Sequence, residues 1–460
     1  MSPQTLPRLL AAYRDPDYIR PLLRIAGPVA LQSLLNSGLN MVSVMMIGQK
    51  GEVSVAAVAL AGQVFFLLNL VLFGLSSGAA MFTAQLWGKQ DVHNIRRVLG
   101  LTLALSAAVA ALFWGVSVLM PQHILAIYTQ DKAVIRLGSD YLRLFAWSFP
   151  FFIVTFAFSS ILRSMGNVRL PVAVSTSVLA LNGVLTYLLL FGVFGWPGMG
   201  VLGAAWAIII SRVLETVVLI ALIYLRRSPL ASHPRDLLDF DLGFAVRILK
   251  PVLPVAVTEI LWSLAITTYN AIYGRMGTES IAAMNIAGTL DQMALVIFFG
   301  LTHGTAVLVG NTIGAGNREK AIAYARRSIG LAAAAGILMG GMLYGVSGLA
   351  LTLYKVSPQV IVNAKNVLGF VSLFFSIRVM NMMMLIGIFR SGGDTNYAMF
   401  LDGIIIWLVG VPLSLLGGMV LGWPVQWVYL MTMMDELTKW VLSLYRFFSG
   451  KWIHDLTRHV

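Results

Sequence analysis

The feature that most constrains this chain is an internal repeat. The stretch from Pro251 to Gly316 matches an earlier stretch when the chain is shifted back by 226 positions. The matching pairs are Pro254-Val255-Ala256 with Pro28-Val29-Ala30, Gly274 with Gly48, Gly277 with Gly51, Ala282-Ala283 with Ala56-Ala57, Ala287-Gly288 with Ala61-Gly62, Phe299-Gly300-Leu301 with Phe73-Gly74-Leu75, Gly304 with Gly78, and Gly314 with Gly88. Because one spacing holds over the whole stretch, we predict that the chain consists of two copies of one folding unit.

Composition places both copies in a membrane. Hydrophobic residues make up 58% of the chain and charged residues 11%, with a mean hydropathy of +0.83. About a quarter of the residues in soluble domains are charged, so a soluble globular protein is excluded. The net charge of +13 would indicate nucleic-acid binding in a soluble protein, but here we expect it to hold loops on the cytoplasmic side. Membrane lipid is therefore an expected partner, and nucleic acid is not.

The sequence contains no pattern that indicates catalysis. Thiol chemistry is excluded because the chain has no cysteine. A Walker-type loop, a zinc-ligand spacing and a nucleophile elbow are also absent from the sequence. The N-terminal segment MSPQTLPRLLAAYRDPDYIRPLLRIAG carries scattered charges and no cleavage site, so we interpret it as an amphipathic lead-in and not as a signal peptide. We expect no enzyme activity, no cofactor and no metal centre, apart from a possible coupling ion.

Twelve apolar segments are long enough to cross a bilayer, for which a helix needs about 20 residues. Their centres lie near Gly38, Val71, Ala108, Phe152, Leu181, Ile210, Leu261, Val296, Ala334, Val379, Val409 and Thr438. The connections alternate between basic and neutral, and the positive-inside rule places the basic set in the cytoplasm. The basic set contains Lys89, Arg96, Arg97, Arg163, Arg169, Arg226, Arg227, Arg235, Arg247, Lys250, Arg318, Lys320, Arg326, Arg327, Arg390, Arg446, Lys451 and Arg458. Both termini are therefore predicted to be cytoplasmic.

The repeat continues through the later segments at spacings of 227 and 221 positions, which match Arg163 with Arg390 and Glu215 with Glu436. The predicted all-α architecture is a six-helix lobe over 1–228, a cytoplasmic linker over 229–245 and a second six-helix lobe over 246–460. Because six helices give both copies the same orientation, we expect the lobes to be related by a pseudo-twofold axis along the membrane normal. This organisation favours a secondary transporter that works by alternating access. Topology alone also permits a channel or a membrane enzyme.

Charged side chains within membrane segments are rare and by default mark functional sites. Several of them have no counterpart in the first copy, and all of these lie in the second. They align as Glu259 with Ser33, Asp291 with Phe65, His303 with Ser77, Arg378 with Phe151, and Asp402 with Ser175. A purely structural role predicts symmetric placement, so the asymmetry indicates function.

Glu259 is the leading candidate for the charge that binds a coupling ion or a substrate. It lies about ten residues into its helix, roughly 15 Å from the end and therefore near the bilayer midplane. Trp262, Tyr269 and Asn270 follow at helical spacing, and we expect them to line a substrate cavity beside it. The alternative is that Glu259 only neutralises a buried cation for stability.

Asp291 is a second candidate for the coupling-ion or substrate charge, and Phe298 and Thr302 continue its face toward the expected cavity. Arg378 needs a carboxylate partner in the membrane, and Glu259 is our first choice.

Three further positions receive narrower predictions. His303 is either a proton relay or a side chain satisfied by a backbone carbonyl. We expect Asp402 to act as a cap, or to snorkel, at the cytoplasmic end of its helix. Asp435 and Glu436 with Lys439 are expected to form a local structural ion pair.

Several motifs in this chain resemble the multidrug and toxic compound extrusion (MATE) family. They are MMIGQKGEVSVAAVALAG with SSGAAMFTAQLWGKQD, the second copy YGRMGTESIAAMNIAG with GNTIGAGN, then FRSGGDT and YRFFSGKWIHDLT. The likeness covers the whole chain. It implies a twelve-helix, two-lobed antiporter of the cytoplasmic (inner) membrane that expels organic cations and amphipathic drugs in exchange for Na+ or H+.

The chain departs from the family pattern at the sites that bind ions. Ser43 stands where many members have an aspartate in the first lobe. The NorM-like branch carries a glutamate on helix seven and an aspartate on helix ten. Glu259 lies about one turn before the first of these, and the second falls near Val379, next to Arg378. The resemblance therefore implies a coupling site near Glu259 for Na+ or H+, and the neighbouring Arg378 favours H+.

We predict a monomeric, secondary active multidrug efflux antiporter that exports cationic or amphipathic organic compounds in exchange for H+ or Na+. Glu259 is expected to bind the coupling ion and the cationic substrate alternately. The alternative is a lipid-linked precursor flippase of the same superfamily, which would be expected to have a strongly basic cavity. A channel is the third possibility, and it predicts currents that are not coupled to a counter-ion.

Overall fold

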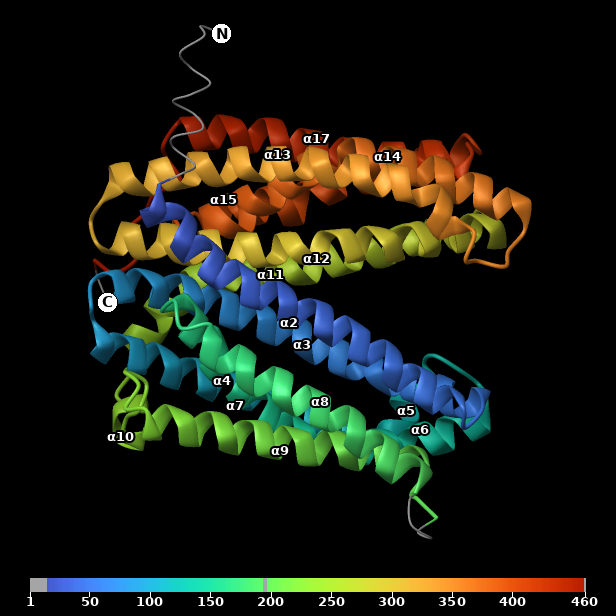
Figure 1. Ribbon diagram of the computed structural model, residues 1–460, viewed down its shortest axis with the longest axis horizontal. Coiled ribbons are helices and arrows are strands. Elements are labelled where there is room, and N and C mark those ends of the chain that lie inside the picture. The colour runs from blue at the N-terminus through green and yellow to red at the C-terminus, as the bar shows by residue number, and fades with distance from the viewer. Residues whose placement is uncertain (1–14, 193–196, 459–460) are drawn as a thin grey trace, which may run out of the picture. The chain divides into compact units, whose positions relative to one another are not determined.

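A computed structural model describes residues 15–192 and 197–458. Most of the expected N-terminal lead-in and part of the Gly195-Trp196-Pro197 connection lie outside these residues. Within the described ranges the chain is helical, and its only β-type contact is one isolated bridge between Gly393 and Ile453. Figure 1 shows long helices joined by short connections. The predicted all-α class is confirmed.

The described residues form twelve long helical stretches, and each expected segment centre falls within one of them. The stretches are α2 (Pro16–Gly48), α3 (Glu52–Gly88), α4 (Val92–Leu119), α6 with α7 (Lys132–Phe145 and Phe149–Ser164), α8 (Arg169–Phe191), α9 (Val201–Leu225), α11 (Leu242–Arg275), α12 (Thr278–Gly314), α13 (Arg318–Leu351), α14 with η2 (Pro358–Met382 and Met383–Arg390), α15 to η5 (Thr395–Met399 through Leu416–Val420), and α17 (Val425–Phe448). Ten of these are long and apolar enough to span a membrane, and the remaining two, α11 and α17, are of similar length. Short helices α5 (Pro121–Ala126) and α10 (Pro234–Leu237) lie in connections.

The turns explain why glycine recurs at matching places in the two copies. Gly51 and Gly277 precede α3 and α12 with φ of +96° and +118°, which a side chain would strain. Gly166 and Gly393 follow α7 and η2 with φ of +82° and +83°. The repeated glycines therefore encode the same turn conformation twice.

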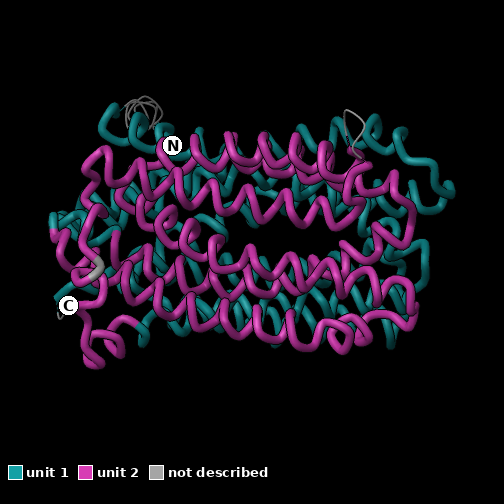
Figure 2. Tube along the Cα trace, turned by 90° about the horizontal axis from the view of Figure 1, so that it is seen from below, with its two compact units in different colours: residues 1–30, 84–90, 249–460 teal, residues 31–83, 91–248 magenta. Residues whose placement is uncertain are grey.

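The helices group into two compact units (Figure 2). Unit 1 contains the described residues of 1–30, 84–90 and 249–460, and unit 2 contains residues 31–83 and 91–248. The beginning of α2 and the last turn of α3 therefore belong to the same unit as the second sequence copy. The predicted lobe boundaries at residues 228 and 246 stay a prediction.

Each unit has its own apolar core. In unit 1, α14 packs against α12, α13 and α17, and the core includes Phe298 and Phe375, whose ring centroids lie 5.6 Å apart. In unit 2, the aromatic side chains of α3, α6 and α7 meet, with the rings of Phe65 and Phe152 4.9 Å apart. Such aromatic clusters bury large areas in specific geometries.

The contact between α13 and α14 in unit 1 depends on small residues spaced four apart. A Cβ on Gly336 would meet the Ser376 backbone at 2.7 Å, and a Cβ on Gly340 would overlap the Ser372 carbonyl oxygen. Ser376 Oγ also donates to the Ala333 carbonyl across the same contact, at 3.0 Å. This is the small-residue packing that lets membrane helices approach closely.

The second sequence copy also contains helical turns of π type, with hydrogen bonds five residues apart. They occupy Met383–Arg390, Phe400–Ile404, Ile406–Gly410 and Leu416–Val420. A π turn inserts an extra residue and so rotates the side chains that follow it, which is why such turns are frequent at functional sites. Two of the charged residues considered below, Arg390 and Asp402, lie in these turns.

We predict that Gly340→Leu destabilises the protein by about 1–3 kcal/mol, because the added side chain has no space between α13 and α14. Thermal unfolding in detergent measures the effect. The matched control is Gly341→Ala, at a position where nothing lies within 4 Å of an added Cβ. An unfolding temperature for Gly340→Leu equal to that of the control would contradict the packing argument.

Candidate functional site

Ionisable side chains from α11, η2, η3 and α17 meet inside unit 1. The members are Glu259 on α11, Arg390 at the end of η2, Asp402 in η3, and Asp435, Glu436 and Lys439 on α17. We call this group the carboxylate–cation network. Ion pairs of 4.0 Å or less connect all six side chains.

Asp402 joins the two cations of the network. Its carboxylate oxygens lie 3.6 Å from Arg390 Nη2 and 3.6 Å from Lys439 Nζ. Arg390 Nη1 also donates to Glu259 Oε1 at 2.7 Å. Arg390 therefore has one short charge-assisted hydrogen bond and one longer contact, whereas Asp402 has only the longer contacts.

The other end of the network is set by helix geometry on α17. Asp435 and Glu436 precede Lys439 by four and three residues, so their side chains lie on its face. Lys439 Nζ lies 3.0 Å from Asp435 and 3.7 Å from Glu436. Asn381 of α14 donates its amide to the Glu436 side chain at 2.7 Å and to the Glu436 carbonyl at 2.8 Å.

The side chains of the network differ in how deeply they are buried. Arg390, Asp435 and Lys439 are 1–3% exposed. The side chains of Glu259, Asp402 and Glu436 retain 13%, 19% and 20% of their accessible surface. The cations are therefore enclosed, while three of the four carboxylates remain partly accessible.

Buried polar atoms without a hydrogen-bond partner among the described residues also lie in and beside the network. They include the Tyr269 hydroxyl, Arg390 Nε and Asn381 Oδ1. Gly410 leaves the space for this arrangement, because a Cβ there would overlap the Tyr269 hydroxyl and lie 3.3 Å from Asp435 Cβ. Tyr269 thus presents an unused donor next to Asp435.

A second, separate pair lies between α12 and α14. Arg378 Nη1 donates to Asp291 Oδ1 at 2.7 Å, and the two side chains are 20% and 13% exposed. Phe298 and Thr302, further along α12, are 2% and 1% exposed. The pair is neutral as a whole, which satisfies the requirement that a buried cation has a partner.

Several sequence predictions need correction. The expected pair between Glu259 and Arg378 is wrong, because Glu259 binds Arg390 and Arg378 binds Asp291. The expected capping or snorkelling role of Asp402 is also wrong, because its carboxylate joins two buried cations.

The ion pair on α17 is not only local, because Lys439 also contacts Asp402. Of the expected cavity residues on α11, Tyr269 is buried beside the network, whereas Trp262 and Asn270 are exposed. His303 is half-buried on α12, and its role stays a prediction.

The sequence analysis overlooked Arg390 and Asn381. Arg390 aligns with Arg163, so a search for charges without a counterpart passes over it, and its place in FRSGGDT assigns it to a basic connection. The sequence did contain a signal for Arg390. In the first copy, Ser33 and Ser175 stand at the positions that Glu259 and Asp402 occupy in the second copy. Both copies therefore have the arginine, as Arg163 and Arg390, but only the second copy has the two carboxylates.

Unit 2 contains the equivalent region without the carboxylates that correspond to Glu259 and Asp402. Glu215 aligns with Glu436 and is bound by Arg212 at 2.7 Å and by Ser175 Oγ at 2.6 Å. Glu215 is 4% exposed. Glu215 and Arg212 form a neutral pair, to which Ser175 adds one hydrogen bond. The excess of carboxylates is therefore found in unit 1 and not in this region of unit 2.

Comparison with known proteins agrees with the repeat and the fold. The MatE family model matches residues 28–188 and matches again at residues 254–416. The two matches begin 226 positions apart, which is the spacing of the internal repeat and confirms the duplication. Together they cover more than half of the chain.

Among similar sequences, the chain is 26% identical over 448 residues to the "Probable multidrug resistance protein NorM" of Thermotoga maritima, covering 95% of this chain and 94% of the relative. It is 28% identical over 417 residues to the protein of the same name from Rhizobium meliloti, covering 86% and 85%.

Solved structures share the fold at low identity. A crystal structure of a MATE protein in complex with MaL6 matches with a TM-score of 0.84 at 18% identity, covering 96% of this chain and 99% of the other. A MOP superfamily transporter from Pyrococcus furiosus matches with a TM-score of 0.84 at 19% identity, covering 96% and 98%. With the family model matched twice in the order of the repeat, this chain belongs to the MatE family of multidrug and toxic compound extrusion transporters.

Proposed function

We propose that the chain is a secondary active multidrug efflux antiporter that exports cationic or amphipathic organic compounds in exchange for H+ by alternating access. The carboxylate–cation network is the proposed coupling site. Relatives with the NorM name support multidrug efflux, and the network supports the coupling. The proposal places a monomer in the cytoplasmic membrane, with both termini and the basic connections in the cytoplasm.

The observation that carries this proposal is the charge balance of the network. It contains the four carboxylates of Glu259, Asp402, Asp435 and Glu436 and only two cations, Arg390 and Lys439. If every group is ionised, two negative charges are left without a partner inside a membrane protein. Each uncompensated buried charge costs several kcal/mol. The network therefore favours the uptake of protons or of a cationic ligand.

The geometry favours protons over Na+. A hard metal cation needs several oxygen ligands that converge on one point. Among the described residues no three acidic or histidine side chains form such a group, and the two cations already lie between the carboxylates. A proton needs only one oxygen atom.

Glu259 and Asp402 are the proposed proton-exchanging groups. Asp435 is the most buried carboxylate and has the shortest contact with Lys439, so it serves chiefly to neutralise that cation. Glu259 and Asp402 are partly accessible, and Asp402 has only 3.6 Å contacts. Deprotonation makes the site more negative and attracts a cationic substrate, and reprotonation weakens that attraction and releases the substrate.

The same charge balance supports cationic compounds over lipid-linked precursors as the transported substrate. An excess of carboxylates attracts cations and repels the phosphate groups of lipid-linked precursors. A flippase of the same superfamily is therefore the less supported alternative.

We predict that Glu259→Gln and Asp402→Asn each reduce pH-gradient-driven export of a cationic dye from proteoliposomes by about tenfold or more. Each change removes a site for a transported proton while preserving shape. Glu319→Gln, an exposed carboxylate in the first turn of α13, is the matched control and should export normally. Full dye export by Asp402→Asn would remove Asp402 from the coupling mechanism.

We predict that an imposed pH gradient drives dye export by the unaltered protein and that an imposed Na+ gradient at equal pH does not. The reason is that Arg390 and Lys439 already lie against the carboxylates of the network, where a sodium ion would have to bind. Dye fluorescence in proteoliposomes with each gradient imposed separately measures this. Export driven by Na+ alone would refute proton coupling.

We predict that Lys439→Met destabilises the protein by about 3–5 kcal/mol, because it leaves Asp435 buried without its cation. The double variant Lys439→Met/Asp435→Asn removes one charge of each sign and should recover much of this loss. Thermal unfolding in detergent distinguishes the two. If Lys439→Met is as stable as the unaltered protein, Asp435 does not depend on that ion pair.

A further inference from the structure

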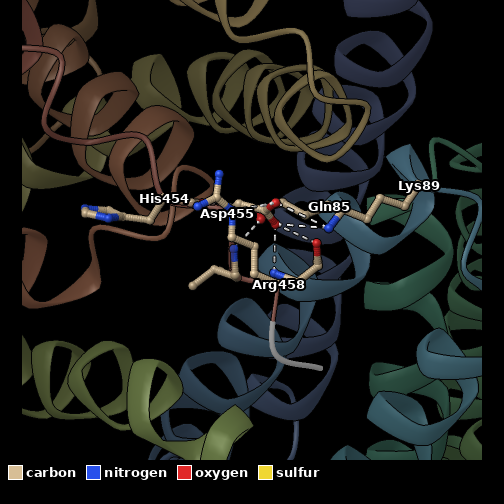
Figure 3. A network of polar contacts seen from close by, with 7 residues as sticks. Gln85, Lys89, His454, Asp455 and Arg458 are labelled. Carbon is tan, nitrogen blue, oxygen red and sulfur yellow. Dashed lines mark hydrogen bonds and ion pairs between the residues drawn. The ribbon is translucent and has the colours of Figure 1, made fainter.

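A buried glutamine in the last turn of α3 bonds to two other parts of the chain. Gln85 is fully buried, and its amide nitrogen donates to the Ser391 carbonyl at 2.9 Å and to the His454 carbonyl at 3.1 Å. Its amide oxygen accepts from the Leu456 N–H at 2.9 Å. Gln85 therefore links α3 to the turn after η2. It also links α3 to the C-terminal tail, residues 449–458 (Figure 3).

An ion pair adds a second link between α3 and the tail. Lys89 Nζ lies 3.3 Å from Asp455 (Figure 3). Asp455 also accepts hydrogen bonds from the side chain and the N–H of Thr457. Burial alone would raise the pKa of Asp455, but the hydrogen bonds from Thr457 and Lys89 lower it overall. A lowered pKa keeps the carboxylate charged at neutral and mildly acidic pH, and the link is lost only as the pH falls through that lowered pKa.

The tail itself is fastened to the second sequence copy. The His454 N–H donates to the Gly392 carbonyl at 2.7 Å, beside the bridge between Gly393 and Ile453. Trp452 is fully buried and stacks on Phe447 with ring centroids 5.7 Å apart. The tail is thus packed against the second sequence copy. The polar contacts described above connect it to α3 through Gln85 and Lys89.

Beneath the tail, the ends of α3 and α12 cross with their backbones in contact. A Cβ on Gly88 would overlap the Asn311 carbonyl oxygen, and a Cβ on Gly314 would overlap the Gln85 carbonyl oxygen. Gly88 and Gly314 are repeat partners, 226 positions apart, and so are Gln85 and Asn311. The contact is therefore reciprocal, in the way that a twofold interface is. Separation of the two helix ends requires Gln85 and Lys89 to leave the tail.

We propose that the C-terminal tail is a conformational latch for transport. In the state of this structure it holds the last turn of α3 against α12, and it releases Gln85 and Lys89 when this end of the transporter opens. The proposal rests on the alternating-access function proposed above. Gln85 makes two hydrogen bonds to the tail and one to Ser391, and Lys89 adds a partly exposed ion pair. Each of these contacts is individually weak, so the latch is strong enough to bias the equilibrium and weak enough to be reversed in each cycle.

Because the chain has no cysteine, a thiol-reactive cross-linker will react only with cysteines that are introduced by mutation. We predict that Lys89→Cys/Asp455→Cys, treated with a short bifunctional methanethiosulfonate, exports dye at less than about one tenth of its untreated rate. Reduction of the cross-link should restore export. The control pair Arg318→Cys/Ser449→Cys joins the tail to α13, where Arg318 donates to the Gly450 carbonyl, and it should export normally after treatment. Unimpaired export by the cross-linked Lys89–Asp455 pair would overturn the proposal.

A second experiment does not depend on transport. Ser391→Cys places a thiol at a position that is 2% exposed and whose carbonyl accepts from Gln85. We expect Gln85→Leu to accelerate labelling of this cysteine by a membrane-impermeant maleimide about tenfold, as the loss of net hydrogen bonds predicts. Equal labelling rates with and without Gln85→Leu would overturn the latch. If the unaltered protein exports no dye under any gradient, the proposed function fails while the labelling result still decides the latch.

Discussion

The structure of unit 1 depends on one constraint: a charge placed inside a membrane protein needs opposite charge beside it. Arg390 and Lys439 are almost fully buried, and Asp402 lies between them with one oxygen toward each. Glu259 and Asp435 complete their surroundings. Because the desolvation cost of a buried ion is several kcal/mol, these helices cannot be rearranged one at a time. In the proposed function, the same constraint drives the excess carboxylates to bind a proton or a cationic ligand, because either would relieve the unpaired negative charge.

Local backbone geometry brings these side chains together. Lys439 meets Asp435 through ordinary helical spacing on α17. Arg390 and Asp402 need more than that, and both lie in π-type turns that rotate the helix relative to a regular α-helix. Gly410 provides the space in which the Tyr269 hydroxyl approaches Asp435. In unit 2, where Ser175 replaces the aspartate, Glu215 is closed off by Arg212 and the charge is balanced.

The carboxylate–cation network and the proposed latch lie on consecutive parts of the chain. η2 ends at Arg390, which belongs to the network, and the next residue, Ser391, accepts a hydrogen bond from Gln85. A change in the protonation of Glu259 alters the charge that holds Arg390, directly beside the turn that the latch contacts. In the proposed mechanism, this adjacency gives a short physical route between proton binding and the release of α3, carried by the consecutive residues Arg390 and Ser391.

Hydrophobic length and repeat spacing can be read along the chain, so they were sufficient to predict the twelve segments, the duplication and the family. The repeat also showed that Glu259 and Asp291 have no charged counterpart in the first copy. The sequence by itself could not determine which charges meet. The pairs Glu259–Arg390 and Asp291–Arg378 depend on how each helix is rotated about its axis and on which helices are neighbours. The π-type turns change that rotation without a signal in hydropathy, so only the tertiary structure could decide the membership of the network and the contact of the tail with Gln85.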